Sequence, residues 1–390
     1  MRIHILSMKS ICLILMVCFI LISASSGQQA SIAEVFRTGQ VRFVPEITIT
    51  DNAMAGKNYF AQISDIAIDE QGNLYACDSK EGNIKKFSAS GSFLKTIGNA
   101  GQGPGEFNYP IEIEFSKGRL CVRELWNMRV SIFDRDRNFM KSVPYEFSGG
   151  KWLNMRALPD GRFIVQREKV NREELNAPQD VFIDLFSSEL EFIKTIYRHQ
   201  VRRNKYITEP RNINVPIPFA PLVYWDVTPD GKLVAGYSGE YEIEVHDPDK
   251  GKISSFSHSY IPVEVTAKDK ELYFQGMTVA VGGPSGIASQ QKGAPDYIIK
   301  NTEFPRYKPP YTNIKVDAEG NIWVQLFGLT IDKDGPRMDV FDSVGHPFGS
   351  VRIKDGGVFP YRMVPLPGGF WTIRLNEDGE WTIVKYKISN

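Results

Sequence analysis

The chain has 390 residues, of which 42% are hydrophobic and 24% charged, so it is long and apolar enough to bury a sizeable core. Its 46 basic side chains equal its 46 acidic ones. This balance argues against a nucleic-acid-binding protein, because such binding rests mainly on Lys and Arg side chains that neutralise phosphates.

The first residues predict a secretory signal peptide, residues 1–27. Arg2 and Lys9 precede an apolar run from Ile11 to Ile22, and small residues follow it. A bilayer-spanning helix needs about 20 apolar residues, so this run is too short for a membrane anchor. We expect an exported mature protein, periplasmic or at the cell surface, with no transmembrane segment.

A unit of strands and tight turns returns along the mature chain, residues 28–390. Its first copy, residues 63–98, alternates apolar and polar residues in four short predicted strands separated by glycine turns. The copies are marked by their first-turn glycines, Gly72, Gly118, Gly161, Gly231, Gly320 and Gly369. The shorter spacings suit a four-stranded propeller blade, and the two longest indicate insertions.

This repetition predicts an all-β fold, a six-bladed β-propeller in a single domain. The last copy contains three strands, whereas residues 41–50 form an extra strand ahead of the first copy. We expect this N-terminal strand to complete the last blade and close the ring, which removes an exposed sheet edge.

The stretch GQGPGEF, residues 101–107, looks at first like a phosphate-binding loop. Such a loop must lead straight into a helix whose N-terminus faces the anion, but this one leads to another predicted strand. We interpret it as a crossover between the first two blades, with Phe107 filling apolar space between them.

GQGPGEFNYP, GNLYACD and NIKKFSASGSFLKTIG together resemble the NHL-repeat family of six-bladed β-propellers, in particular its secreted bacterial members. The resemblance is closest over residues 63–143, less close over 220–390 and weakest over 144–219. The other copies lack the GxGPGEF signature. The resemblance implies the propeller fold, and some six-bladed propellers are lyases or lactonases that hold a divalent ion in the central channel.

Cys77 and Cys121 are the cysteines that follow the signal peptide. Both lie in apolar, strand-like segments about one repeat apart. This setting favours buried free thiols over a disulfide bridge, although one bridge is arithmetically possible.

Long connections are expected on one face of the propeller, the upper face, and tight turns on the other. The long connections are residues 166–180, 198–221, 261–310 and 328–337. Because loops on a rigid scaffold often carry function, the upper face and the mouth of the channel are the candidate site.

The longest of these connections, the insertion 261–310 between blades four and five, contains a predicted helix. Thr266 is its expected N-cap, and Leu272, Tyr273 and Met277 are expected on an apolar side. We expect this helix to lie over the mouth of the channel as a lid or brace.

Cationic, aromatic and polar residues near the ends of second strands are candidate ligand-binding residues on the upper face. They are Arg123, Glu124, Trp126, Arg167, Gln325, Phe327 and Arg374. Such a ring suits peptide or carbohydrate recognition. Arg202 and Arg203, in the basic stretch 197–206, suit an acidic glycan or an acidic protein surface, or form an ordinary solvated loop.

A calcium site needs only oxygen ligands, and Asp65, Glu112 and Asn313 fall at similar places near the upper starts of inner strands. The alternative is a hydrated polar channel without metal. The histidines lie in non-equivalent segments, so a three-histidine zinc site is not expected.

Taken together, the signal peptide, the repeats and the candidate binding residues favour an exported, non-enzymatic and monomeric propeller that binds a protein, peptide or glycan and needs no cofactor. One alternative is a metal-dependent hydrolase or lyase with calcium or zinc in the channel. Another is a structural module of an envelope assembly.

Overall fold

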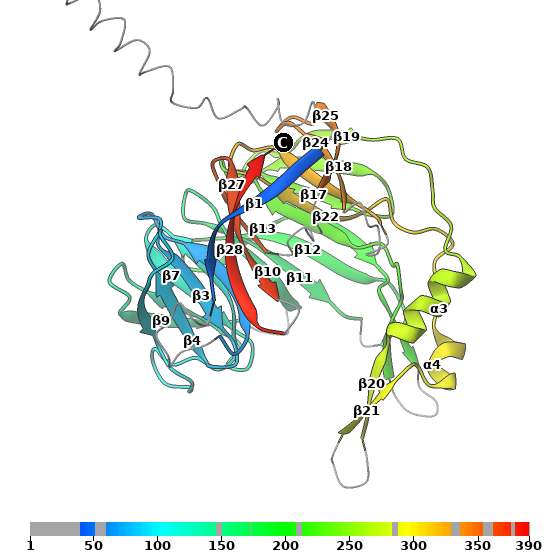
Figure 1. The fold of residues 1–390 in the computed structure, drawn as a ribbon, viewed down its shortest axis with the longest axis horizontal. Helices are drawn as coiled ribbons and strands as arrows, with labels where there is room; N and C mark the ends of the chain where they lie inside the picture. The colour runs from blue at the N-terminus through cyan, green and yellow to red at the C-terminus, as the bar shows by residue number, and fades with distance from the viewer. Residues whose placement is uncertain are drawn as a thin grey trace, which may run out of the picture.

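The computed structural model describes residues 40–50, 60–145, 150–171, 173–207, 213–282, 288–328, 336–353, 362–375 and 379–389. The predicted signal peptide and the cleavage site lie outside the described residues. Strands dominate the described part of the chain, which has few helices (Figure 1). No helix found there is long and apolar enough to cross a membrane.

Four antiparallel sheets of four strands each follow one another along the chain. The first contains β2 (Ile63–Ile68), β3 (Leu74–Asp78), β4 (Asn83–Phe87) and β5 (Phe93–Ile97). The second contains β6 (Pro110–Ser116), β7 (Arg119–Glu124), β8 (Arg129–Phe133) and β9 (Phe139–Pro144). The third contains β10 (Lys151–Ala157), β11 (Phe163–Lys169), β12 (Gln179–Phe186) and β13 (Phe192–Val201). The fourth contains β16 (Val223–Val227), β17 (Leu233–Tyr237), β18 (Glu242–Asp247) and β19 (Gly251–Ser257).

The remaining large sheet has eight strands in the order β22-β23-β24-β25-β1-β28-β27-β26. Its first half is β22 (Tyr311–Val316), β23 (Ile322–Leu326), β24 (Arg337–Phe341) and β25 (Pro347–Ile353). Its second half is β26 (Met363–Leu366), β27 (Gly369–Leu375), β28 (Trp381–Ser389) and β1 (Gln40–Ile49).

The N-terminal strand joins the last strand of the chain, as predicted. β1 pairs antiparallel with β28, from Arg42 opposite Ser389 to Ile49 opposite Ile383. A second contact was not foreseen. The start of β1 also pairs parallel with β25, where Val41 lies opposite Ile353, and this pairing merges the two halves into one sheet.

The first turn of each sheet is tight because residues within the turn form hydrogen bonds with one another. In the first sheet Gly72 has φ +81° and its N–H donates to the Asp69 carbonyl at 2.9 Å, while the Asp69 carboxylate accepts from the N–H of Asn73 at 2.9 Å. In the last turn the left-handed residue is Gly368 (φ +66°), so the expectation for Gly369 is wrong by one position.

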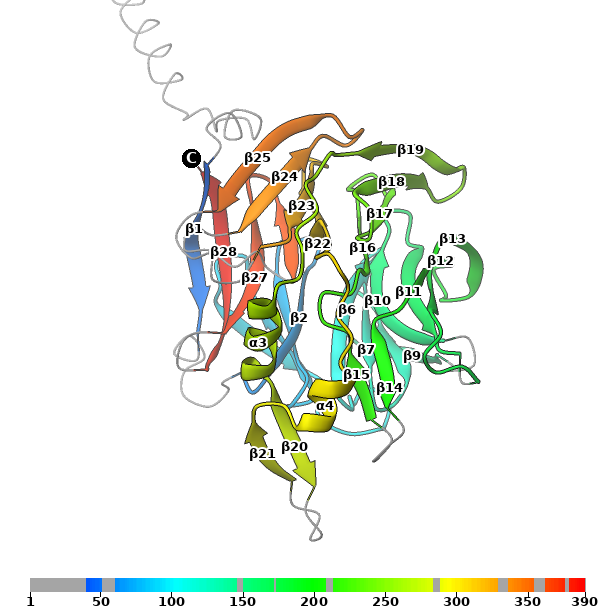
Figure 2. The same cartoon turned by 90° about the vertical axis from the view of Figure 1, so that its right-hand side faces the viewer.

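Apolar clusters lie between successive sheets and hold them face to face. Phe107 is fully buried between the first and second sheets, and its ring lies 5.5 Å from that of Phe133, so the crossover interpretation of residues 101–107 is confirmed. The ring of clusters closes where Ile49 and Trp371 pack against Leu74 of the first sheet. The fold is therefore propeller-like, with β2, β6, β10, β16 and β22 around a common centre (Figure 2).

The connections between sheets carry the remaining elements on one side of the molecule (Figures 1 and 2). These are β14 (Asn204–Ile207), β15 (Ile213–Pro216), α3 (Ala267–Gly276), β20 (Thr278–Gly282), β21 (Ala288–Lys292) and α4 (Asp296–Asn301). This side is the upper face. A small apolar cluster that includes Ile207, Val215 and Ile298 joins the β14–β15 hairpin to α4.

Helix α3 begins as the sequence predicts, with Thr266 as N-cap in a capping box with Asp269. Its buried side chain is a carboxylate, because Asp269 pairs with Lys308 at 2.8 Å. Leu272 is exposed, so the expected apolar side is wrong at that position. Tyr273 does pack, edge-on against Phe304.

Candidate functional site

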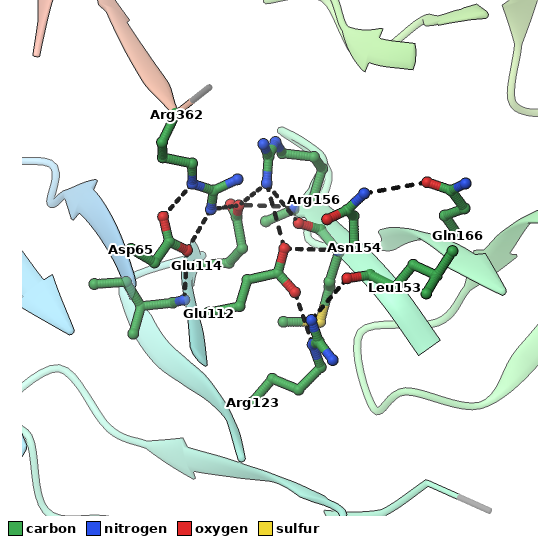
Figure 3. Close-up of polar contacts among 12 residues, drawn as sticks. Asp65, Glu112, Glu114, Arg123, Leu153, Asn154, Arg156, Gln166 and Arg362 are labelled. Atoms are coloured by element: carbon green, nitrogen blue, oxygen red, sulfur yellow. Dashed lines mark hydrogen bonds and ion pairs between the residues drawn. The ribbon is translucent and has the colours of Figure 1, made fainter. Parts of the chain in front are cut away.

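Charged residues gather where the first strands of the sheets approach one another (Figure 3). We call this group the inner-strand cluster. Its members are Asp65, Glu112, Glu114, Arg123, Arg156, Asp226, Lys315 and Arg362. Four of them are acidic and four basic, so their formal charges cancel.

Arg362 joins the last sheet to the first and second sheets. It forms an ion pair with Asp65 through two of its nitrogens and lies 3.3 Å from the Glu114 carboxylate. Burial raises the pKa of Asp65, and the charge of Arg362 opposes that rise. The guanidinium therefore provides positive charge to the buried carboxylate of Asp65 and to the half-buried carboxylate of Glu114 on the neighbouring strand.

Glu112 is held by two further arginines. Arg123 Nε donates to its carboxylate at 2.8 Å, and Arg156 lies 3.5 Å away. Burial alone would raise the pKa of Glu112, but the charges of Arg123, Arg362 and Arg156 outweigh burial and lower it. Arg123 also donates to the Leu153 carbonyl at 2.8 Å, so it links β7 to β10.

Glu114 and Lys315 are the members of the cluster whose pKa values are shifted towards neutral pH. Burial raises the pKa of Glu114 to about 7, although Arg156 lies 3.1 Å away. Burial lowers the pKa of Lys315 to about 8, against the charge of Asp226. Both groups thus change charge near neutral pH.

Three acids of the cluster also bind the backbone of the first strand in the next sheet. Asp65 accepts from the N–H of Ile113 at 2.9 Å, and Glu112 accepts from that of Met155 at 2.9 Å. These two contacts lie at equivalent places in the repeat. Asp226 makes a similar contact with the N–H of Val316 at 3.1 Å, but from a position nearer the first turn of its sheet.

The predicted calcium ligands are committed to these contacts. Both oxygens of Asp65 and both of Glu112 accept hydrogen bonds from the protein or pair with arginine. Asn313 lies on β22, and no described contact joins it to either acid. No group of three or more His, Cys, Asp or Glu side chains within the described ranges is placed to hold a metal ion. The donor set therefore does not fit a divalent cation without breaking ion pairs.

Two of the predicted ligand-binding residues are turned inward. Arg123 belongs to the inner-strand cluster, and Glu124 is fully buried. The Glu124 carboxylate accepts from Arg129 at 2.8 Å and from Ser131 at 2.6 Å. Arg129 in turn donates to three carbonyls of the segment 102–106, so this glycine-rich segment surrounds a side chain of the protein itself.

Other predicted residues lie at the upper ends of strands and remain accessible. Trp126 follows β7, is 65% exposed and touches the ring of Tyr109 edge-on. Arg374 lies over the ring of Tyr386, and Gln325 and Phe327 are half-buried.

The remaining predicted arginines are engaged in ion pairs. Arg167 pairs with Asp184 and Arg203 with Glu168. Arg202 lies 2.7 Å from Glu303, at the end of the insertion. Arg202 therefore links the basic stretch 197–206 to the insertion, a connection that the sequence did not reveal.

A pocket of about 400 Å³ opens on the upper face between the fourth sheet and the β22–β25 strands. We call it the upper pocket. Its walls include Tyr241, His258, Tyr260, Ile261, Val263, Phe327, Arg337 and Asp339. Of these, only Phe327 was a sequence candidate, because the others lie before or within connections whose spatial neighbours the sequence does not give.

Asp339 forms the floor of the upper pocket. It is buried, accepts from the Tyr241 hydroxyl at 2.7 Å and from Ser350, and lies 4.0 Å from His258 Nε2. The neighbouring cation is also committed, because Lys308 pairs with Asp269 and lies 5.6 Å from the centre of the Phe327 ring. The polar groups at the floor of the pocket are therefore paired with other groups of the protein.

Cys77 and Cys121 are free and buried, as predicted. Burial raises the pKa of Cys121 to about 12 and that of Cys77 well above its ordinary value. Neither thiol is therefore suited to act as a nucleophile.

Comparisons with known proteins support the fold alone. No family model matches the chain, and no curated protein matches it. Among solved structures, the "Putative exported protein" of Bacteroides fragilis has 12% identity, with 90% of this chain and 96% of that one covered at a TM-score of 0.54. A member of the DUF4221 family from Bacteroides vulgatus has 13% identity, with 90% and 99% covered at a TM-score of 0.51. A gluconolactonase from Xanthomonas campestris has 12% identity, with 88% and 97% covered at a TM-score of 0.44. The first two matches show that this chain shares an all-β, propeller-like fold with the two Bacteroides proteins.

Proposed function

We propose that the mature chain, residues 28–390, is an exported six-bladed β-propeller of the NHL-repeat type that binds a protein, peptide or glycan through its upper face. Counting the two halves of the eight-stranded sheet separately supports six blades. The gathering of hairpins and helices on one side supports the choice of face.

The upper pocket is the observation that carries the binding proposal. It combines apolar walls with the exposed guanidinium of Arg337, which forms no ion pair with any described residue. Trp126 and Arg374 extend the accessible aromatic and cationic surface on the same face. Concave, mainly apolar sites with a few polar groups are typical of ligand binding.

A binding screen tests the proposal. The mature chain is presented to glycan and peptide arrays, together with the double variant Trp126→Ala/Arg374→Ala. A matched control, Arg135→Ala/Val344→Ala, removes one cation and one apolar side chain from exposed lower turns. We expect capture by the native chain and the control, and weaker capture by the upper-face variant.

The two contrary outcomes have different meanings. Equal capture by both double variants contradicts the upper-face assignment. Capture of neither peptides nor glycans contradicts the binding function itself.

A hydrolase or lyase is the second candidate, and it is favoured by two members of the inner-strand cluster, Glu114 and Lys315, whose pKa values are shifted towards neutral pH. Their pKa values of about 7 and about 8 are of the kind found in general acid and base catalysts. A metal-dependent version requires the acids of the inner-strand cluster to leave their arginines. Metal analysis of the purified protein tests that version, because stoichiometric calcium or zinc favours a metal-dependent enzyme.

A further inference from the structure

We propose, on the basis of the binding function above, that the ligand of the upper pocket is a peptide segment in which an acidic residue adjoins an apolar side chain. The peptide lies along residues 259–263, at the rim of the pocket, and its carboxylate pairs with Arg337. Four observations on the upper face support this assignment.

The rim exposes large apolar side chains close together. Ile261 is 89% exposed, Val263 55% and Tyr260 39%, and all three border the upper pocket. Single exposed apolar residues are ordinary on protein surfaces, but a contiguous group beside a pocket marks an interaction site. An apolar side chain of the ligand would cover this group.

The backbone of the same segment is available for pairing. The backbone N–H of His258 donates to the Tyr241 carbonyl at 3.1 Å, and the backbone N–H of Lys308 donates to the Val263 carbonyl at 2.8 Å. Between these anchors, residues 259–261 form no hydrogen bond with the described residues, and the chain stretches from β19 towards α3 (Figure 2). A peptide strand can use such free backbone groups.

The charge at the pocket is positive. Lys308 is paired with Asp269, and Asp339 is bonded to Tyr241 and Ser350, so both are committed inside the protein. Arg337 is exposed and forms no ion pair within the described ranges. A ligand carboxylate is the complementary group, since guanidinium and carboxylate form paired hydrogen bonds.

The aromatic rings of the pocket favour a peptide over a sugar. A pyranose stacks on an open ring face, but the ring of Phe327 is already covered by Lys308 and by the edge-on contact with Phe219. Tyr241 is buried. Tyr260 alone among these three offers accessible ring surface, whereas backbone pairing and aliphatic contacts are both available to a peptide.

A randomised heptapeptide library displayed on phage provides the test, with the full mature chain as target. We expect enriched peptides to carry Asp or Glu beside an aliphatic or aromatic residue. Binding of a synthetic enriched peptide should weaken about ten-fold in Arg337→Gln and in Ile261→Ser, as for loss of one good contact. Arg306→Gln is the matched control, because Arg306 is an exposed arginine beside the same segment that does not line the pocket. It should change binding less than about two-fold, within the range of a rim charge.

All three variants alter exposed side chains, so unchanged thermal melting shows that each remains folded. Enriched peptides without acidic residues, or binding that survives Arg337→Gln, overturn the proposal. If peptide binding survives both Arg337→Gln and Ile261→Ser but is lost in Trp126→Ala/Arg374→Ala, the binding function stands and this pocket assignment fails. If acidic oligogalacturonate is captured and no peptide is, the ligand class is wrong. If neither is captured, both proposals fail.

Discussion

The inner-strand cluster and the upper pocket both contain arginine and acidic side chains, but these side chains have different roles in the two regions. In the cluster, Arg362 is largely enclosed and pairs with Asp65 and Glu114, and the formal charges of the members cancel. At the pocket, Arg337 is exposed and has no ion pair with a described residue. Charges that are matched inside the protein hold the sheets in register, whereas an unmatched charge beside apolar surface is available to a ligand.

Both regions depend on closure of the ring, so deletion of residues 28–50 should have the largest effect. It removes β1, whose Val41 and Ile49 are fully buried, and exposes the edges of β25 and β28. Two such side chains and the strand pairing correspond to a loss of about 5 kcal/mol or more in the free energy of unfolding. Urea unfolding measures the loss.

If the deletion variant does not fold, Val41→Ala replaces it and should cost about 2 to 3 kcal/mol. A deletion variant as stable as the mature chain contradicts the closure by β1.

Substitution of each arginine tests whether the two have different roles. Arg362→Met leaves Asp65 and Glu114 buried with less positive charge, and we expect a loss of about 3 to 5 kcal/mol, as for one partner of a buried ion pair. Arg337→Met changes an exposed side chain and should stay within about 0.5 kcal/mol. Equal losses in urea unfolding would show that the two arginines are not used differently.

The sequence predicted the fold better than the site, for a physical reason. Alternation, turn glycines and Phe107 are local signals, so the sheets, the closing strand and the crossover followed from them. The partners Arg362 and Asp65 lie 297 residues apart and meet only because the ring closes. The residues of the upper pocket likewise come from separate connections, and spacing alone does not bring Tyr260 beside Arg337.

Local pattern also misled where partners decide the role of a side chain. Glu124 is the last residue of a second strand, two positions before the accessible Trp126, but its carboxylate accepts hydrogen bonds from Arg129 and Ser131 of the next strand and is buried. Asp65 and Glu112 were candidate calcium ligands, beside the alternative of a polar channel without metal, because acids at the starts of inner strands suit calcium. The sequence pattern did not show that arginines pair with both of them.

Glu114 makes the cluster sensitive to pH. Its pKa of about 7 in the folded protein exceeds the ordinary value of 4.5. Between these values the folded state binds more protons than the unfolded state, so the contribution of Glu114 to stability is complete below about pH 4.5 and is lost as pH rises to about 7. Glu114→Gln should flatten this part of the curve.

Chemical unfolding of both proteins at pH 5, 6, 7 and 8 measures the difference. Arg156, Arg362, Asp65 and Glu112 face Glu114 and are unchanged in the variant, so they contribute equally to both curves. A difference in stability that is constant across this range contradicts the raised pKa.

Metal should have the smallest effect on the inner-strand cluster. A cation that binds the folded state with a dissociation constant of about 10 μM would add roughly 2.7 kcal/mol at 1 mM, which is a clear rise in melting temperature. Because the oxygens of Asp65 and Glu112 are already bonded to arginine and backbone N–H groups, we expect 1 mM calcium or EDTA to shift Tm by less than about 1 °C. The variant Arg123→Met is a more sensitive test of metal binding than the native chain, because it removes the cation nearest to Glu112. If calcium stabilises this variant but not the native chain, the arginines are what exclude metal, and if calcium stabilises both, the inner-strand cluster is a metal site after all.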